Sequence, residues 1–273
     1  MSIEFAKNKC LEEMKMKKVL AIVLVLCMVL CAMTASAETV LEKIKKAGVL
    51  VVGTEATYGP YEFLDDDAKP IGCDIWLAQQ IADELGVELK IQDMAFDGII
   101  DAVKSGVVDI GIAAFTVNEE RAKVIDFSNQ YELSEQLLIV KKGNGETYAT
   151  KESLAGKKVG AQLGTTGSFA VKKMAPKAQL RNYDDVGLAF QDMKNGNIDA
   201  VVCDDPVAAY YANHDADYAN TLKLAFLTEE GESVGFAFRK GDTELVSKFN
   251  EALARVRANG TEQALLKQWK MGK

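Results

Sequence analysis

The feature that most constrains the fold is a regular alternation of short β-rich runs with amphipathic helical runs. Strands are predicted at 49–53, 87–94, 108–113, 158–161, 178–183 and 199–203, and helices at 74–85, 97–104, 166–174 and 184–194. Strands that are joined by helices pair in parallel and are covered by those helices. The pattern therefore predicts an α/β architecture with parallel sheets.

A faint internal repeat divides this pattern in two. The segment KSGVVDIGIA (104–113) corresponds to KNGNIDAVVC (194–203), which begins 90 residues later. In each copy a helix ends at a glycine, an aspartate opens a strand, and polar residues follow the carboxyl end of that strand. Open α/β sheets bind ligands outside the carboxyl ends of their strands. Two similar lobes with facing edges are thus predicted to form a ligand cleft.

The C-terminal segment is predicted to return to the first lobe. An apolar run at 234–239 is followed by a helical stretch at 242–270, with a break at Asn259-Gly260. Packing of this stretch on the first lobe would make that lobe discontinuous in sequence.

The predicted division assigns 38–134 and 230–273 to lobe 1 and 135–229 to lobe 2. The chain then crosses between the lobes twice, near 134–141 and 222–229. Both crossings are β-like in sequence, so they predict a two-strand hinge.

The first 37 residues are predicted to be a secretory signal peptide. Lys15, Lys17 and Lys18 precede fifteen uncharged, mostly apolar residues at 19–33, and 34–37 ends in an A-x-A cleavage site. A membrane span needs about 18 to 20 apolar residues, so the run is short for one. We expect a protein secreted across the cytoplasmic membrane, periplasmic or associated with the cell surface.

The cysteines agree with this interpretation. Cys27 and Cys31 each follow a leucine, whereas lipobox cysteines usually follow a small residue, so a lipid anchor is the second choice. Cys73 and Cys203 lie in apolar stretches of the mature chain and are expected to be two buried free thiols.

Composition narrows the functional classes. The 273 residues carry 32 basic and 40 acidic side chains, a net charge of −8, with no basic cluster, which argues against a nucleic-acid partner. The single histidine, His214, argues against a Ser-His-Asp triad and an HExxH zinc site. The sequence 231–235 fits G-x-S-x-G, but a strand follows it where a nucleophile elbow needs a helix.

Oppositely charged side chains follow the two repeat strands. Thr116 and Arg121 follow the first, and an arginine there can bind a carboxylate in a bidentate pair or remain a solvated surface residue. Asp204 and Asp205 follow the second, where a carboxylate can hold an ammonium group or cap the helix starting at Pro206.

A segment between a strand and a helix, 164–168 (GTTGS), is a candidate anion site. Free amides at the helix N-terminus, with the hydroxyls of Thr165 and Thr166, suit a carboxylate. Ordinary N-capping by either threonine is the alternative.

Aromatic side chains follow other strands of the pattern. Tyr58 and Phe96 are placed to enclose a ligand side chain, and Glu55 would favour a cationic one. Packing in the core is the alternative role for the two rings.

Taken together, these segments resemble the family 3 extracellular solute-binding proteins, the polar amino-acid receptors of ABC importers. The resemblance covers essentially the whole mature chain, through 51–63, 71–86, 96–109, 116–128, 152–169, 196–211 and 258–269. It implies a two-lobed periplasmic-binding-protein-like fold of type II, with two α/β lobes on a two-strand hinge that close on a free amino acid.

The resemblance also implies roles at the two charged ends of the ligand. Arg121 resembles the arginine that binds the α-carboxylate, with the amide and hydroxyl of Thr166. Asp205 resembles the acid that holds the α-ammonium, with the Thr116 hydroxyl and the Ala114 carbonyl. A buried zwitterion needs both partners, because each buried charge must be paired.

Side-chain selectivity is implied at four positions. Tyr58 and Phe96 match the aromatic pair around the ligand side chain, and Glu55 and Gln162 match selectivity positions. Glu55 with Phe96 is similar to members that bind arginine or lysine.

The resemblance implies a monomeric receptor without a cofactor that delivers a polar, basic amino acid to an ABC transporter permease. A cyclohexadienyl dehydratase-like enzyme on the same scaffold is the alternative, with Glu55 as its candidate acid or base. The ligand-binding core of a channel or sensor is a further alternative, which would need transmembrane helices or a signalling domain.

Overall fold

The computed structural model describes residues 16–17, 38–148, 150–214, 220–223, 231–260 and 264. Residues 1–39 and 40–273 form separate compact units, and the fold below is that of the second. In the first, Met16 and Lys17 are helical. Nearly all of the predicted signal peptide, with Cys27 and Cys31, lies outside the described residues, as do 224–229 of the predicted second crossing. Among the described residues, no helix has the length and apolar character of a membrane span.

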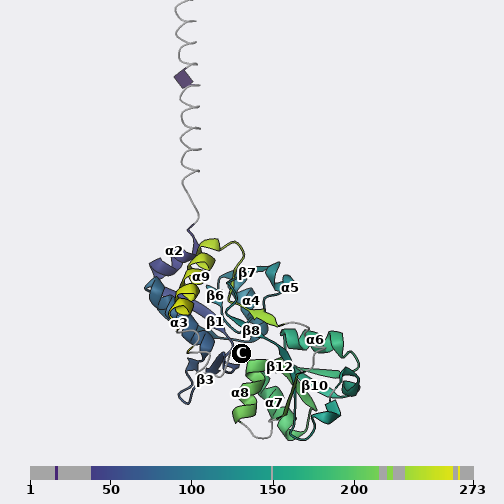
Figure 1. The fold of residues 1–273 in the computed structure, drawn as a ribbon. Coiled ribbons are helices and arrows are strands. Elements are labelled where there is room, and N and C mark those ends of the chain that lie inside the picture. Colours follow the sequence, from purple (N-terminus) through teal and green to yellow (C-terminus); the bar gives the residue numbers. More distant parts are fainter. Residues whose placement is uncertain are drawn as a thin grey trace, which may run out of the picture. The chain divides into compact units, whose positions relative to one another are not determined.

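The first five-stranded sheet has the order β5-β1-β6-β15-β7 (Figure 1). Its strands are β5 (Glu88–Asp93), β1 (Val49–Thr54), β6 (Ile110–Gly111), β15 (Ala237–Arg239) and β7 (Ile125–Phe127). β1 runs parallel to β5 and β6, as predicted. β15 is antiparallel to both β6 and β7, so the sheet is mixed and the prediction of purely parallel sheets was wrong. The reason is that β15 returns from the C-terminal part of the chain, outside the strand–helix alternation.

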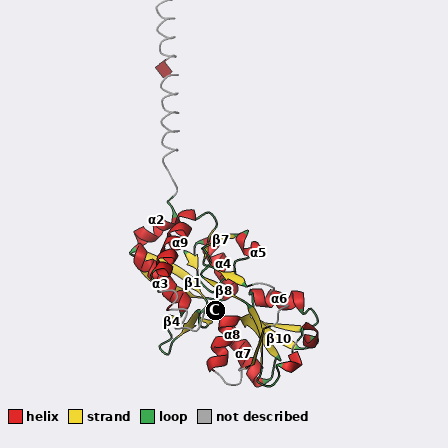
Figure 2. Cartoon of the chain, in the orientation of Figure 1, coloured by secondary structure: helices red, strands yellow, loops and turns green. Residues whose placement is uncertain are grey.

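Helices cover this sheet on both sides of β1 (Figure 2). They are α2 (Val40–Ala47), α3 (Cys73–Leu85), α4 (Phe96–Ser105) and α9 (Thr243–Ala258), with the short α5 (Glu119–Ala122) beside β7. β1 contacts α2, α3 and α4, which explains why its sequence, VLVVGT, is apolar almost throughout rather than alternating.

The second five-stranded sheet has the order β11-β10-β12-β9-β13. Its strands are β11 (Gln179–Tyr183), β10 (Lys158–Gln162), β12 (Ala200–Asp204), β9 (Gln136–Val140) and β13 (Asn220–Lys223). β10 runs parallel to β11 and β12, whereas β9 is antiparallel to β12 and β13. The helices here are α6 (Thr166–Met174), α7 (Val186–Asn195) and α8 (Asp205–His214), with 3₁₀ turns η1 (Glu146–Tyr148) and η2 (Lys151–Leu154).

The internal repeat is reproduced in the backbone. α4 ends at Gly106 and α7 at Gly196, with left-handed φ angles of 77° and 81°. Asp109 then accepts a hydrogen bond from the Val51 amide, and Asp199 accepts one from the Lys158 amide, each at 2.8 Å. Each aspartate thus ties the start of its own strand to the neighbouring parallel strand.

Two smaller sheets complete the described strands. β8 (Glu132–Ser134) pairs with β14 (Glu232–Val234), and β3 (Glu62–Leu64) lies between β2 (Thr57–Tyr58) and β4 (Pro70–Ile71). Glu135 alone separates β8 from β9 of the second sheet. The predicted lobe boundaries, 38–134 with 230–273 and 135–229, remain a prediction.

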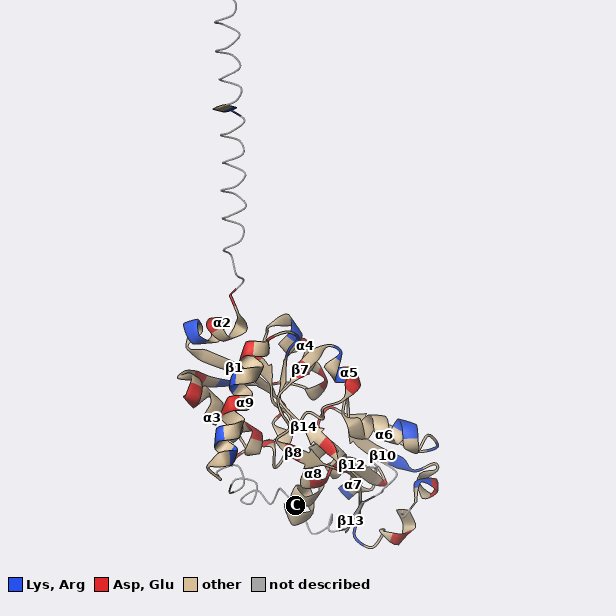
Figure 3. Cartoon of the chain, turned by 45° about the horizontal axis from the view of Figure 1, so that its top comes forward, with Lys and Arg blue, Asp and Glu red and all other residues tan. Residues whose placement is uncertain are grey.

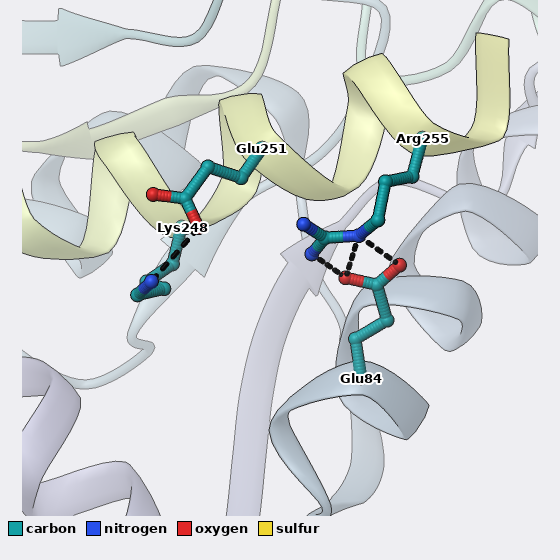
Figure 4. A network of polar contacts seen from close by, with 4 residues as sticks. All are labelled: Glu84, Lys248, Glu251 and Arg255. Carbon is teal, nitrogen blue, oxygen red and sulfur yellow. Dashed lines mark hydrogen bonds and ion pairs between the residues drawn. The ribbon is translucent and has the colours of Figure 1, made fainter. Parts of the chain in front are cut away.

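Helix α9 packs against α3 through a buried apolar stripe that includes Leu245, Phe249 and Leu253. On its outer side Arg255 forms an ion pair with Glu84 of α3, and Lys248 pairs with Glu251 within α9 (Figure 4). Exposed pairs of this kind are screened by solvent and contribute little to stability, so the apolar stripe dominates. The helical stretch predicted over 242–270 is interrupted at the predicted break, because α9 ends at Ala258 with Asn259 as its C-cap; from 261 on, only residue 264 is described.

Charges of both signs alternate over the helices of the second unit (Figure 3). The last turn of α6 is basic, with Lys172 and Lys173. In the interior, Cys73 and Cys203 are buried thiols outside any disulfide, as predicted.

Candidate functional site

A small cavity brings together most of the residues expected from the sequence. Its lining consists of Tyr58, Phe96, Ala113, Ala114, Thr116, Arg121, Gln162, Thr165, Thr166 and Asp204. The first six precede the second sheet in sequence, and the last four belong to β10, β12 and the start of α6. The cavity volume is about 10 Å³, which is room for roughly one water molecule. A larger molecule would fit between these residues only if the walls moved apart.

Arg121 is the buried cation of the site. Its side chain is nearly buried beside the Phe96 and Phe115 rings, and its guanidinium carbon lies 5.4 Å from each ring centre. Its Nη1 donates to the Thr116 carbonyl at 2.8 Å and its Nη2 to the Gly164 carbonyl at 3.1 Å. Burial lowers the pKa of Arg121 to about 10, so the group is still charged at neutral pH. Among the described residues no carboxylate forms an ion pair with it, so further donors are available to an anion.

Asp204, the last residue of β12, is the buried anion. Tyr58 donates its hydroxyl to Oδ2 at 2.6 Å, while Ser134 Oγ and Gln136 Nε2 donate to Oδ1 at 2.8 and 2.7 Å. Burial raises the pKa of Asp204 to about 6, and the hydrogen bonds from Tyr58 and Ser134 oppose that rise. The carboxylate is thus held in one orientation and is ionised at neutral pH.

The structure places Asp204, and not the expected Asp205, in the lining of the cavity. Asp205 is the first residue of α8, and its Oδ1 accepts hydrogen bonds from the Glu135 amide at 2.9 Å and Ser134 Oγ at 3.2 Å. Sequence analysis ended the strand at Cys203, whereas β12 continues to Asp204. Neighbouring residues point to different sides at a strand end, so a shift of one residue decides which of the two carboxylates lines the cavity.

The two threonines at the start of α6 have different partners: the Thr165 hydroxyl caps the helix, whereas the Thr166 hydroxyl contacts Glu232. Thr165 is the N-cap: its hydroxyl accepts from the Ser168 amide at 3.2 Å and donates to the Gln162 carbonyl at 2.8 Å. Ordinary capping, the alternative considered from sequence, therefore occupies this hydroxyl. The first amides of α6 have no carbonyl partner within the helix and remain suited to an anion.

Glu55 lies behind Gln162 and does not line the cavity. Gln162 Nε2 donates to Glu55 Oε2 at 2.8 Å and to the Asp184 carbonyl at 3.1 Å, while Thr57 Oγ1 donates to Glu55 Oε1 at 2.6 Å. Burial raises the pKa of Glu55 to about 6. Glu55 and Gln162 thus act as one connected unit at the side of the cavity.

The aromatic residues are part wall and part core. Phe96 stacks on Phe115 with ring centres 4.9 Å apart, and Tyr58 stacks on Tyr61 at 6.3 Å. Ala114 adopts a φ of 45°, which is unusual for a residue with a Cβ, and its amide donates to Asp74 Oδ2 at 2.9 Å. Ala113, also in the lining, has no side-chain polar group.

A polar cluster that no sequence motif indicated lies beside the cavity and consists of Ser134, Gln136 and Glu232. Glu232 Oε2 accepts from Thr166 Oγ1 at 2.9 Å, Gln136 Nε2 at 3.1 Å and Thr116 Oγ1 at 3.4 Å. Glu232 was noticed only as a letter of G-x-S-x-G. It is positioned by the pairing of β14 with β8, to which no local motif points.

The G-x-S-x-G segment itself has the geometry expected from the sequence argument. Its Ser233 is the middle residue of β14, and the Ser233 hydroxyl donates to Gln130 Oε1 at 2.9 Å. Within the described part of the chain, no cluster of three or more histidine, cysteine, aspartate or glutamate side chains is arranged to hold a metal ion.

Two lobes of this topology, with a cation and an anion lining one cavity, define an α/β binding protein. The sequence profile of the bacterial extracellular solute-binding proteins, family 3, matches residues 50–273. The chain belongs to this family.

Relatives of known name are similar over most of their length. The L-cystine-binding protein TcyJ of Escherichia coli (strain K12) is 37% identical over 232 residues, which is 85% of this chain and 86% of TcyJ. The arginine-binding extracellular protein ArtP of Bacillus subtilis (strain 168) is 34% identical over 226 residues, 82% of this chain and 86% of ArtP.

Solved structures agree with the fold. The ancestral amino acid-binding protein AncCDT-1, a precursor of cyclohexadienyl dehydratase, has a TM-score of 0.80 at 39% identity and covers 85% of this chain and 99% of its own. A Streptococcus pneumoniae amino acid ABC transporter substrate-binding protein bound to L-arginine also has a TM-score of 0.80, at 35% identity, over 85% of this chain and 97% of its own.

Proposed function

We propose that the protein is an extracytoplasmic receptor that captures a free L-amino acid between its lobes and delivers it to an ABC importer. The observation that carries this proposal is the pair of buried opposite charges, Arg121 and Asp204, in the lining of one cavity. An amino acid is a zwitterion, and burying it requires a fixed cation for its carboxylate and a fixed anion for its ammonium. Relatives named for binding cystine, arginine and histidine support the same ligand class.

The finer proposal is a basic side chain, with arginine or lysine favoured. Glu55 supplies a second buried carboxylate at the side of the cavity, and Gln162 connects it to the wall. A cationic side chain that displaces the Gln162 amide would gain a charge-assisted hydrogen bond to Glu55. Tyr58 and Phe96 would enclose the aliphatic part of that side chain and can attract its charge.

Capture requires the lobes to separate and close again. Tyr58 binds Asp204 and Glu55 binds Gln162, so both hydrogen bonds join residues far apart in sequence and on different sheets or their loops. A ligand must break or replace them to enter the cavity. The two-strand hinge, the cleaved signal peptide, the permease partner and the monomeric state belong to the same proposal.

The test is a thermal-shift screen of the chain from Glu38 onward against the twenty amino acids and cystine, followed by calorimetry. A ligand that binds only the folded state raises the melting temperature, and at a fixed concentration the rise grows with the logarithm of its affinity. Arginine or lysine should give the largest rise. Stabilisation by cystine or glutamine alone would refute the basic side chain, and no stabilisation by any of them would refute the receptor.

An enzyme on the same scaffold is the second candidate. Glu55 favours it, because a buried carboxyl with a pKa near 6 can serve as a general acid or base. Turnover of prephenate or arogenate by the purified protein would establish it, and loss of that turnover in Glu55→Gln would assign the residue.

A further inference from the structure

One carboxylate beside the cavity collects the hydrogen bonds of the hydroxyls that a ligand would use. Glu232 Oε2 lies 2.9 Å from Thr166 Oγ1 and 3.4 Å from Thr116 Oγ1, and the two hydroxyls are 3.3 Å from each other. Both threonines line the cavity, whereas Glu232 lies just outside the lining. Gln136 Nε2 lies 3.1 Å from the same glutamate oxygen.

The hydrogen positions in this group follow from the donor inventory. A carboxylate can only accept, so the Thr166 hydroxyl hydrogen points to Glu232. The Thr166 oxygen also lies 3.2 Å from Gln136 Nε2, whose two hydrogens it shares with Asp204 Oδ1 at 2.7 Å and Glu232 Oε2 at 3.1 Å. The Thr116 hydroxyl hydrogen then points to Glu232 or to the Thr166 oxygen. In this arrangement Glu232 Oε2 takes up the Thr166 hydrogen and lies within reach of the Thr116 hydroxyl, so a ligand would compete with Glu232 for both hydroxyls.

This arrangement matters because a ligand carboxylate also only accepts hydrogen bonds. Beside Arg121 it would compete with Glu232 for the hydrogens of the two hydroxyls, with the negative charge of Glu232 close by. Binding must therefore turn at least one hydroxyl away from Glu232. The Arg121 charge attracts both carboxylates, the internal one and the incoming one.

We propose that Glu232 is an internal competitor for the α-carboxylate subsite and lowers the affinity of the receptor by holding the Thr116 and Thr166 hydroxyls. This inference rests on the proposed function, because it presupposes an amino acid with its carboxylate at Arg121. It assigns Glu232 a role in setting affinity: it acts through the two threonines and is a positioning residue.

The first experiment compares Glu232→Gln with the wild type by calorimetry, with L-arginine and L-argininamide as ligands. Glutamine keeps the shape of the side chain and removes its charge. We expect arginine to bind about fivefold to twentyfold more tightly to the variant, because one like-charge repulsion is lost. The affinity for argininamide, which lacks the carboxylate charge, should differ by no more than about twofold between the variant and the wild type. Ser233→Ala, on the same strand with its hydroxyl on Gln130, is the matched control and should leave both affinities unchanged.

The second experiment is a double-mutant cycle with Thr166→Val, which remains informative if Glu232→Gln folds poorly. In the wild type, removing the Thr166 hydroxyl removes a bond to the ligand and also the competing bond to Glu232, so arginine affinity should change by about twofold or less. In Glu232→Ala, the hydroxyl is free to donate, and Thr166→Val should then cost about fivefold.

The possible results of these experiments distinguish failure of the role of Glu232 from failure of the proposed receptor function. Weaker binding of both ligands to Glu232→Gln would place Glu232 at the ligand ammonium and overturn the inference, as would an unchanged affinity for arginine. In either case the receptor function would stand. If the wild type binds no amino acid, the proposed function fails, and the role of Glu232 fails with it.

Discussion

In the first copy of the internal repeat, Asp109 fixes the start of β6 to the amide of Val51; in the second, Asp199 fixes the start of β12 to the amide of Lys158. Beyond these shared starts the copies diverge. β6 is two residues long and gives way to a buried turn at Ala113 and Ala114, whereas β12 runs for five residues.

Because the two copies of the repeat diverge after their shared starts, they supply side chains of opposite charge. The chain after β6 leads to Arg121, and β12 ends directly on Asp204, so one copy supplies the buried cation and the other the buried anion. The shared part of the repeat builds the sheet, while the residues just past the strand ends carry the chemistry. Changes at strand ends should therefore affect binding, and changes at the shared starts should affect stability.

The largest effect is expected at the cationic end. Arg121→Ala should weaken amino-acid binding by about a hundredfold or more, because it leaves the ligand carboxylate buried without its charge partner. Calorimetry measures the affinity, and a thermal melt checks that the variant folds. Arg121→Lys keeps the charge but loses the planar fork, so it should restore only part of the affinity. An unchanged affinity in Arg121→Ala would overturn the assignment.

At the anionic end of the site, the neighbouring carboxylates Asp204 and Asp205 allow two matched substitutions to be compared. Asp204→Asn should weaken binding by about thirtyfold, because a buried ammonium loses its counter-charge. Asp205→Asn should alter affinity by no more than about threefold and cost about 1 kcal/mol of folding stability, since its carboxylate holds the Glu135 amide. The reverse order of the two affinity losses would restore the original sequence-based choice of Asp205.

Affinity should also depend on pH through this end of the site. Burial raises the pKa of Asp204 to about 6, so the free protein holds a proton there below that pH and must lose it to bind an ammonium. Affinity should rise about tenfold from pH 5 to pH 7 and level off above that. Glu55 titrates in the same range, so the control is Glu55→Gln, which should keep the part of the profile due to Asp204. A profile that stays unchanged in Asp204→Asn would contradict this assignment.

The smallest effects are expected at the shared part of the repeat. Gly106→Ala and Gly196→Ala should each lower the free energy of unfolding by about 1 kcal/mol, because both glycines have left-handed φ angles. A Cβ at Gly106 would lie 3.0 Å from Arg239 Nη2, the far end of a flexible side chain, so the two costs should be similar. Amino-acid affinity should not change in either variant. Melting temperatures, expected to fall by about 2 to 4 °C, are the measurement.

Much of the fold was predictable because its signals are local. Helix α6 begins and ends where the sequence pattern placed it, at Thr166 and Met174, and the glycine stops of α4 and α7 were recognised from their sequence. Strands β15, β9 and β13 pair in the antiparallel direction with partners distant in sequence. A local pattern contains no information on such pairings.

The same division applies to the site. Arg121 itself was indicated by the segment that follows a predicted strand, whereas its contacts with Phe96 and Gly164 and the choice between Asp204 and Asp205 depended on distant pairing and on where β12 ends. The contact of Glu232 with Thr166 spans 66 residues of sequence and depends on the pairing of β14 with β8. No motif predicts a side chain whose position is fixed by a remote strand.

The two buried thiols provide a way to time the opening of the molecule. Cys203 precedes Asp204 in β12 and is 2% exposed, and burial raises the pKa of its thiol well above the usual value. Because the thiolate is the reactive form, alkylation of Cys203 must wait for solvent to reach it. The variant Cys73→Ser leaves Cys203 as the cysteine of residues 38–273. Its alkylation rate would therefore report how often Cys203 becomes accessible to solvent. Slowing of that rate by a saturating amino acid would measure how long the ligand keeps β12 covered.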